Sequence, residues 1–249
     1  MGKNLISYRL IYKETDALIK AESEDAIWAA RRAIIDNRNE LERYIFRDPW
    51  FKYSFEPVEV EHLAPEIVRR MAEAAKVARV GPMAAVAGAL AQVGVEGAVK
   101  AGGARNAIVE NGGDIYMHGD ESYRVAIHAG GSPLSNKLAL EIEPSMMPVS
   151  VCTSSGSVGP SISFGNADAV TVIAKSGALA DAAATSICNE TRGEPKQAII
   201  RALERAKNIH GVISVLIIYG NYVGHWGVLP EVIFTDRVSE ELAKRLSIE

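Results

Sequence analysis

The stretch from Ala107 to Lys175 most constrains the fold, because it contains a series of short strand-like segments joined by short connections. These segments are, in order, AIVE, DIYMHG, YRVAIHA, LALEIE, VSVCTS and AVTVIAK. Connections of this length favour antiparallel pairing. Helices are expected at about 178–189 and 195–207, followed by strands at GVISVLIIYG and EVIFTD and a short terminal helix. Strands and helices that occur in groups, without strict alternation, predict an α+β fold.

The N-terminal part is expected to open with two strands and continue as helices. The first 21 residues alternate on either side of KETD, which predicts a strand on each side. Ser23 suits a helix N-cap, and Ile27 and Trp28 open an amphipathic pattern that continues to Ile45. The segment RDPWFKYSFEPVEVEH is expected to be a connection, and a second helix begins near Pro65, since proline suits a first helical turn.

Composition and charge narrow the function classes. With 48% apolar and 23% charged residues the chain has the balance of a folded globular protein, and we expect one domain over 1–249 in which 1–80 carry fewer recognisable signals than 81–189. A net charge of −4 gives no electrostatic case for nucleic-acid binding. The N-terminus lacks the apolar stretch of a signal peptide, and runs such as GVISVLIIYG are far shorter than the roughly 20 residues that span a bilayer. Two cysteines form no disulfide framework, so we expect a cytoplasmic protein that is not bound to a membrane.

A segment rich in alanine and glycine follows Gly81 and extends to about Gly119. A helix of such small residues can approach a neighbouring backbone closely, and glycine permits dihedrals that other residues avoid. One interpretation is a tightly packed core helix. The other is a scaffold around a ligand that requires a close approach of the backbone.

Two polar turns are candidate binding segments. In ENGGDI, adjacent glycines expose N–H groups that can face a phosphate, although Asn-Gly is also a strong hairpin signal. In CTSSGS, a strand ends in a thiol, several hydroxyls and a glycine, which could cradle a pyrophosphate or form an ordinary polar turn. CTSSGS does not match the G-x-S-x-G pattern of serine hydrolases.

The stretch LADAAATS places one carboxylate and one hydroxyl in a run of alanines. Asp181 and Thr185 are four residues apart, so a helix brings them together on one face. A hard cation binds oxygen ligands, and Mg²⁺ takes one or two carboxylates while phosphates and water complete its shell. The alternatives are an acid stabilised by the helix dipole and a threonine bonded back to the helix backbone.

The order of these segments resembles the ApbE family of flavin-trafficking proteins. That family carries a V-N-x-G-G-D-I-like segment, a T-S-G segment, and V-T-V followed by A-D-A-x-A-T; here ENGGDI, CTSSG, VTVIA and ADAAATS follow in the same order within Gly81–Asn189. More narrowly, the chain is similar to a compact branch found in methanogens and sulfate reducers. The resemblance implies an α+β fold with T-fold-like antiparallel sheets and packed helices.

The resemblance also implies ligands and the residues that hold them. ApbE enzymes bind FAD and Mg²⁺ and move FMN from FAD onto a threonine of a target protein. Their metal-holding residues map onto Asp181 and Thr185. Their nucleotide-binding segments map onto Asn111, Gly112, Gly113 and Asp114, and onto Thr153, Ser154, Ser155 and Gly156. We therefore expect a flavin nucleotide (FAD or FMN), Mg²⁺, a protein target and, by analogy with other T-fold-like sheets, a homodimer.

One departure from the family weakens the case for transfer. The transferases carry H-x-x-D-P-x-T-G between the T-S-G and V-T-V segments, and its histidine is implicated in catalysis. Here that interval is SVGPSISFGNADA, which contains no histidine. His225, in YVGHWG, is left as a candidate that could approach the site in space, with a structural role as the alternative.

The same region supplies a thiol, Cys152, immediately before the T-S-G threonine. In a loop rich in N–H groups its pKa is expected to be lowered, which would make Cys152 a catalytic thiol with Cys188 as its partner; buried packing is the alternative for both. Relatives in methanogens are associated with sulfide assimilation and homocysteine formation. Three hypotheses follow: a flavin-nucleotide and Mg²⁺ binder, a sulfur-assimilation factor with a sulfur-pathway partner, and a non-catalytic binding or assembly protein.

Overall fold

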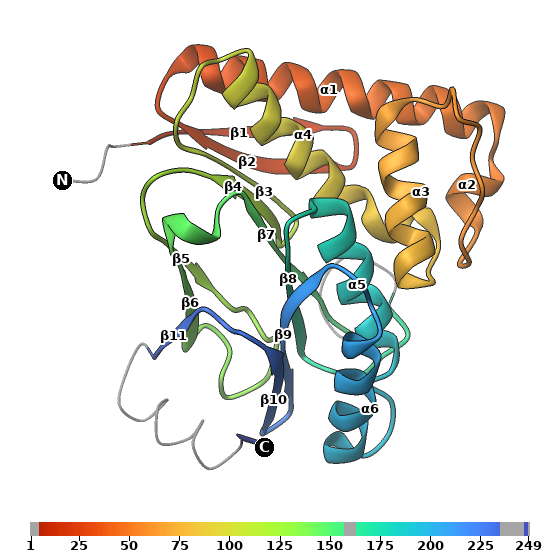
Figure 1. The fold of residues 1–249 in the computed structure, drawn as a ribbon, viewed down its shortest axis with the longest axis vertical. Helices are drawn as coiled ribbons and strands as arrows, with labels where there is room; N and C mark the ends of the chain where they lie inside the picture. Colours follow the sequence, from red (N-terminus) through yellow and green to blue (C-terminus); the bar gives the residue numbers. More distant parts are fainter. Residues whose placement is uncertain (1–4, 157–162, 235–246, 249) are drawn as a thin grey trace.

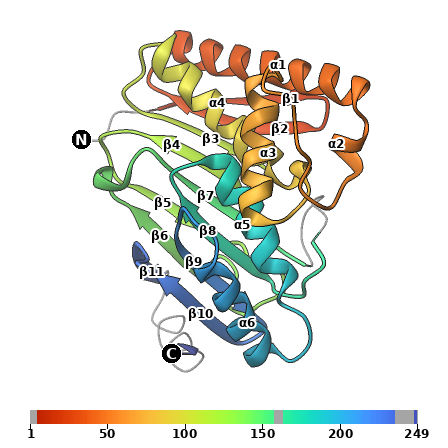
Figure 2. The ribbon, with the colours of Figure 1, turned by 45° about the vertical axis from the view of Figure 1, so that its right-hand side comes forward.

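The computed structural model describes residues 5–156, 163–234 and 247–248. Its elements form three layers, in which helices cover one face of a nine-stranded sheet and a three-stranded sheet lies against the other face (Figures 1 and 2). The sheets are antiparallel apart from one edge pair, and strands and helices occur in groups. The prediction of an α+β fold is confirmed.

The large sheet has the order β1-β2-β3-β4-β7-β8-β9-β10-β12. All its neighbouring strands are antiparallel except β10 and β12, which are parallel. Its strands are β1 (Ile6–Tyr12), β2 (Thr15–Ala21), β3 (Ala107–Asn111), β4 (Asp114–His118), β7 (Val149–Ser154), β8 (Ala169–Ala174), β9 (Val212–Tyr219), β10 (Tyr222–Gly227) and β12 (Ser247–Ile248).

The small sheet has the order β11-β6-β5 and lies against the face of the large sheet that is turned away from the helices. Its strands are β5 (Tyr123–Ala126), β6 (Leu138–Ile142) and β11 (Glu231–Phe234). Side chains alternate between the two faces of a strand, so β7 directs Val151 into the cluster under the small sheet and Cys152 into the cluster under the helices. This alternation determines which residues of β7 can reach the helices.

The helical layer follows the amphipathic patterns of the sequence. Ser23 caps the first helix, since its Oγ accepts from the Ala26 backbone N–H at 3.2 Å, as predicted. The helices are α1 (Glu24–Arg47), α2 (Trp50–Tyr53), α3 (Glu66–Ala78), α4 (Val86–Lys100), α5 (Gly177–Asn189) and α6 (Pro195–Lys207), with short 3₁₀ turns η1 (Pro82–Ala85) and η2 (Pro144–Met146).

The first part of the alanine- and glycine-rich segment forms η1 and α4, which lie inside the helical layer. Over Pro82–Lys100 the two form a 19-residue helical stretch apolar enough to cross a membrane by length and composition. Over half of it is buried inside the protein, against α1, α5 and strands β3 and β4. It is thus longer than the apolar runs singled out from the sequence, and it packs as a core helix.

Two elements differ from the expectations. The connection after α1 contains the short helix α2, and the segment YVGHWG, not predicted as a strand, forms β10 by pairing with β9. Tertiary pairing explains this, because two glycines weaken the intrinsic strand preference of that segment. The predicted terminal helix lies in 235–246, outside the described residues.

Candidate functional site

Four segments meet between the large sheet and the helices: the turn between β3 and β4, the end of β7, the first turn of α4 and the first turns of α5. Contacts among their residues join all four. The positions predicted from ENGGDI, CTSSG and ADAAATS are therefore brought to one region of the fold.

The turn between β3 and β4 is a two-residue hairpin loop. Asn111 pairs with Asp114 across the ladder, and Gly112 and Gly113 have φ values of 64° and 100°, a region that glycine adopts readily. Both glycines are exposed, and a Cβ at Gly112 would meet nothing within 4 Å. The Asn111 side-chain amide donates to the Ala87 carbonyl at 3.2 Å, which fixes the turn against α4. The loop is therefore a hairpin whose two glycines are exposed to solvent, with the Gly113 N–H donating to the Glu110 carboxylate at 2.7 Å.

Asp181 belongs to α5 but lies at the N-terminus of α4. Its Oδ2 accepts a hydrogen bond from the Gly88 backbone N–H at 2.9 Å. This approach requires a glycine, because a Cβ at Gly88 would lie 2.8 Å from the Cβ of Asp181. Part of the Asp181 surface stays accessible, yet shielding of its carboxyl from water, followed by repulsion from Asp114, raises its pKa well above the usual range. Asp181 of α5 thus accepts a hydrogen bond from the first turn of α4, while the negative charge of its ionised form is poorly stabilised.

Asp114 is the second acid of the site. It is 5% exposed, and its carboxylate accepts hydrogen bonds from the Cys152 thiol and from the backbone of Thr153. Its buried Oδ1 has no hydrogen-bond partner among the described residues. Burial raises the pKa of Asp114 to about 7, with a smaller contribution from Glu110. Two neighbouring acids that resist ionisation, one with an unsatisfied oxygen, are the arrangement that a cation would stabilise.

Cys152 lies beside both acids and is fully buried. Its Sγ is 3.2 Å from the Ser150 hydroxyl and 3.8 Å from the Gly177 carbonyl oxygen. Burial, then repulsion from Asp114 and Asp181, raises the pKa of the Cys152 thiol well above its usual range. The expectation of a lowered pKa is therefore wrong, because Cys152 lies inside β7 against two acids rather than in a loop of free N–H groups.

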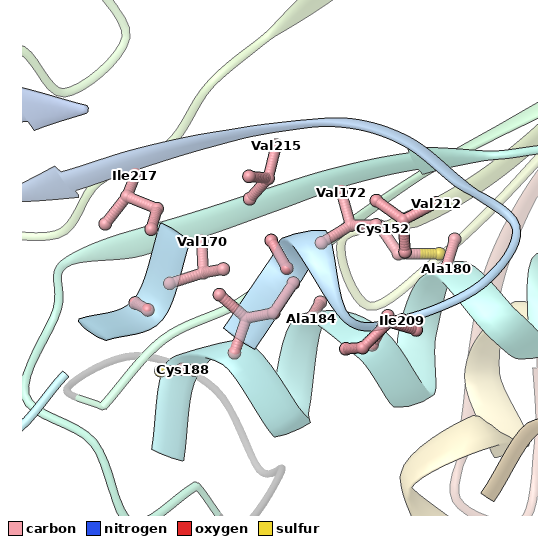
Figure 3. Close-up of a cluster of buried hydrophobic side chains, with 14 of the residues drawn as sticks. Cys152, Val170, Val172, Ala180, Ala184, Cys188, Ile209, Val212, Val215 and Ile217 are labelled. Carbon is pink, nitrogen blue, oxygen red and sulfur yellow. The ribbon is translucent and has the colours of Figure 1, made fainter. Parts of the chain in front are cut away.

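Cys188 occupies the opposite end of the same apolar cluster (Figure 3). Its Sγ accepts from the Ser163 hydroxyl at 3.0 Å, and burial raises its pKa. Cys188 follows Gly177, which contacts Cys152, by 11 residues of helix, which is about 16 Å along the helix axis. Since disulfide formation requires Cα atoms within about 7 Å, the expected partnership between Cys152 and Cys188 is wrong.

Thr153 and Ser154, the last residues of β7, point to opposite faces of the sheet. The Thr153 hydroxyl is 3.0 Å from that of Thr171, on the face turned away from α5, so Thr153 reaches Asp114 through its backbone alone. Ser154 is buried on the helix face beside Cys188. Of the two predicted hydroxyls, Ser154 faces the helices.

Ser155 and Gly156 follow directly after β7. The Gly156 N–H donates to the Ala167 carbonyl at 3.0 Å, and a Cβ at Gly156 would lie 2.1 Å from the Gly165 carbonyl oxygen. Glycine is therefore required at 156 for close packing of two backbone segments, whatever further role this turn has.

Thr185 is buried one helical turn after Asp181, on the same face of α5. Asp181, Thr185 and the unpartnered Oδ1 of Asp114 supply only oxygen donors, the ligand type of a hard cation. No group of three or more His, Cys, Asp and Glu side chains suited to a metal occurs in the described part of the chain. The donor set therefore fits Mg²⁺ whose shell is completed by ligand phosphates and water, and it does not suit a zinc-type centre.

His225 lies away from these residues. It is on β10, three strands from β7 in the large sheet. Val223, two residues earlier, packs under the small sheet, so His225 projects to the same side, opposite the helices. His225 therefore does not approach Asp181 or Thr185.

Two surface hollows lie along α3. One, of about 430 Å³, is bounded by Arg70, Val77 and Leu179 among others, and a second, of about 200 Å³, lies near His62. None of the predicted binding residues lines either hollow.

The contribution of α4 was missed by the sequence reasoning. The Gln92 side-chain oxygen accepts a hydrogen bond from the Gly177 backbone N–H at 2.8 Å. Gln92 lies one helical turn after Gly88, whose backbone N–H donates to Asp181. The available signal was Gly88 and Gln92 at helical spacing within VAGALAQ, which places both on one face. Without knowledge of the facing helix, that spacing identified no partner.

A family model described as AbpE bacteria matches residues 2–210. A UPF0280 protein of Methanocaldococcus jannaschii is 44% identical over 232 residues, covering 92% of this chain and 93% of the relative. A UPF0280 protein of Methanosarcina acetivorans is 45% identical over 232 residues, covering 93% of this chain and 90% of the relative.

Solved structures share the fold at low sequence identity. The flavinyl transferase ApbE of Pseudomonas stutzeri, in its apo form, aligns with a TM-score of 0.57 at 12% identity over 92% of this chain and 95% of that one. The flavin transferase ApbE of Vibrio cholerae aligns with a TM-score of 0.55 at 15% identity over 86% and 93%. The similarity extends over most of both chains and supports the T-fold-like architecture.

Proposed function

This chain belongs to the AbpE bacteria family, and we propose that it binds a flavin nucleotide, FAD, together with Mg²⁺ held by Asp181 and Thr185. The fold it shares with solved flavin transferases supports this proposal at the level of architecture. The residues of the site support it at the level of chemistry.

The observation that carries the proposal is the pair of neighbouring acids. Asp114 keeps a buried oxygen without a hydrogen-bond partner, and Asp181 is held beside it at the start of α4. Burial disfavours both anions in the free protein, and repulsion from Asp114 adds to the penalty on Asp181. A divalent cation would remove this penalty, and Thr185 adds a neutral oxygen one turn along α5.

The surrounding backbone suits a nucleotide. Gly112 and Gly113 carry no side chain and are exposed, so a flat ligand can approach the backbone of this turn closely. Of the two glycine N–H groups, that of Gly112 is the donor left for such a ligand, because the Gly113 N–H donates to the Glu110 carboxylate at 2.7 Å. Asn111 fixes that turn against α4, and Asp181 is fixed by Gly88. A Mg²⁺ ion at this site would neutralise the charge of a pyrophosphate.

Binding is better supported than FMN transfer. Transfer to a hydroxyl needs a group that accepts its proton, and the interval that carries the family histidine contains none here. His225 faces the other side of the sheet. The sulfur-assimilation hypothesis loses its main physical support, because the Cys152 thiol is buried and its pKa is raised.

The test is a titration of the purified protein with FAD, followed by flavin fluorescence, in Mg²⁺ and in EDTA. We expect saturable binding that tightens in Mg²⁺, and an Asp181→Asn variant that loses the Mg²⁺ effect. Asp16→Asn is the control, because Asp16 is exposed on β2 and pairs with Arg9 of β1, away from α5. Absence of FAD binding, or an unchanged Mg²⁺ effect in Asp181→Asn, would refute the proposal.

A further inference from the structure

We propose that Phe55 and Phe164 form a stacking platform for the flat heteroaromatic ring of the bound nucleotide, an inference that rests on the function proposed above. Phe164 belongs to the interval that departs from the family pattern, and Phe55 to the connection between α2 and α3.

The two rings contact each other although they are 109 residues apart in sequence. Their centroids are 5.4 Å apart with an interplanar angle of 62°, an edge-to-face arrangement. Phe55 is nevertheless 61% exposed and Phe164 48% exposed. The pair therefore leaves a large aromatic surface in water, where a planar ligand ring could cover it.

Phe164 is fixed in place by its backbone. Its N–H donates to the Asn189 side chain at 2.8 Å, and its carbonyl accepts from the Arg192 guanidinium at 2.9 Å. The same guanidinium lies 5.7 Å from the centroid of the Phe164 ring. Because both backbone groups of Phe164 are held, little backbone freedom is lost when a ligand stacks on its side chain, and Arg192 adds positive charge beside the ring.

The turn that carries Phe55 is fixed by contacts of the residues on either side of it. The preceding residue, Ser54, packs its carbonyl against Gly81 so closely that a Cβ there would lie 1.9 Å from that oxygen. The Ser54 hydroxyl accepts from the Glu56 N–H at 3.1 Å and donates to its carbonyl at 2.8 Å. Phe55 therefore projects from a fixed turn.

The platform lies at the C-terminal end of α5, and its distance from Asp181 and Thr185 suits a nucleotide. Asn189, which holds Phe164, follows Thr185 by four residues and Asp181 by eight, which correspond to about 6 Å and 12 Å along the helix axis. A ligand with its pyrophosphate at Asp181 and Thr185 would place a ring, separated by its sugar or ribityl chain, near the C-terminal end of α5. Bases stack on exposed aromatic side chains with little dependence on their identity, so the platform suits an isoalloxazine or an adenine.

A second aromatic pair supplies an internal control. Tyr8 and Trp28 lie 5.4 Å apart, Arg31 lies 5.5 Å from the Trp28 ring, and Trp28 is 50% exposed. This trio has the same chemistry as Phe55, Phe164 and Arg192 but lies on β1 and α1, away from α5. Loss of the Trp28 ring should therefore not affect nucleotide binding.

The experiment measures the affinities of Phe55→Leu, Phe164→Leu and Trp28→Leu for FAD, FMN and ADP in Mg²⁺ by calorimetry. Leucine keeps an apolar side chain and removes the ring, and circular dichroism confirms that each variant is folded. We expect the two phenylalanine variants to bind FAD about tenfold more weakly and the Trp28 variant to match the unmodified protein. A parallel loss for FMN identifies the ring as isoalloxazine, and a parallel loss for ADP identifies it as adenine.

If the Phe55 and Phe164 variants bind each of the three nucleotides as tightly as the Trp28 variant does, the platform is overturned and the proposed function is left intact. Failure of the unmodified protein to bind any of the three nucleotides would overturn both.

Discussion

Gly88 of α4 and Gly177 of α5 face each other where the two helices cross. A Cβ at Gly88 would lie 2.2 Å from the Gly177 carbonyl oxygen, and a Cβ at Gly177 would lie 2.3 Å from that of Gly88. Because real Cβ atoms do not approach oxygen so closely, glycine at both positions is what allows Asp181 to reach the first turn of α4. The helix crossing and the candidate site therefore depend on the same contact.

Replacing Gly88 by alanine should separate the two helices at this crossing. We expect Gly88→Ala to lower the free energy of unfolding by about 2 kcal/mol, since the clash is with backbone and cannot be relieved by a side-chain rotation. Urea denaturation measures the change. Gly131→Ala is the control, because a Cβ at Gly131 meets nothing within 4 Å and its φ is not positive. A Gly88 variant as stable as the Gly131 variant would disprove the proposed crossing.

The unfolding free energy of the metal-free protein should depend on pH through Asp114. Its pKa is about 7 when folded and about 4 when unfolded, so between these values the folded protein keeps a proton that the unfolded chain releases. The stability that comes from this retained proton is fully present below pH 4 and is lost as the pH rises through 7. The free energy of unfolding falls by no more than about 1.4 kcal/mol per pH unit over this range. Asp181, Cys152 and Glu110 surround the group. Replacing Asp114 by asparagine also lowers the pKa values of Asp181 and Cys152, because it removes the repulsion from Asp114.

Asp114→Asn removes that titration, so the variant should gain stability relative to the unmodified protein as the pH rises from 5 to 7. Urea titrations in EDTA at several pH values measure the difference. A difference that stays constant over this range would show that Asp114 has an ordinary pKa in the folded protein.

The Cys152 thiol should react slowly with a disulfide reagent in the native protein. It is fully buried and its pKa is raised, so little thiolate is present and access requires local opening. A Cys188→Ser variant leaves Cys152 as the single thiol and isolates its rate. We expect rapid reaction only after addition of denaturant. Rapid reaction at pH 7 without denaturant would restore the thiol hypothesis.

The sequence predicted the elements well where local patterns were strong. The capping residue Ser23, the proline before α3, and the alternating strands from β3 to β9 all gave signals that depend on neighbouring residues. Strand β10 was missed because its glycines weaken any local pattern, and its pairing with β9 is decided by tertiary contact.

The candidate site was predicted as a set of positions and not as a set of contacts. The spacing of Asp181 and Thr185 placed them on one face, as found. Whether the Cys152 thiol was activated or suppressed depended on Asp114 and Asp181 beside it. That juxtaposition arises from the meeting of β4, β7 and α5, which no local pattern in the sequence encodes.

The most direct test of the proposed cation site is the effect of Mg²⁺ on FAD affinity in a Thr185→Val variant. Valine keeps the shape of Thr185 and removes its oxygen. Thr171→Val is the control, because Thr171 is buried on the opposite face of the sheet, bonded to Thr153. We predict that Mg²⁺ tightens FAD binding by about tenfold or more in the unmodified protein and in Thr171→Val, and that this gain disappears in Thr185→Val. An equal Mg²⁺ effect in all three proteins, or none in the unmodified one, would contradict a cation site at Asp181 and Thr185.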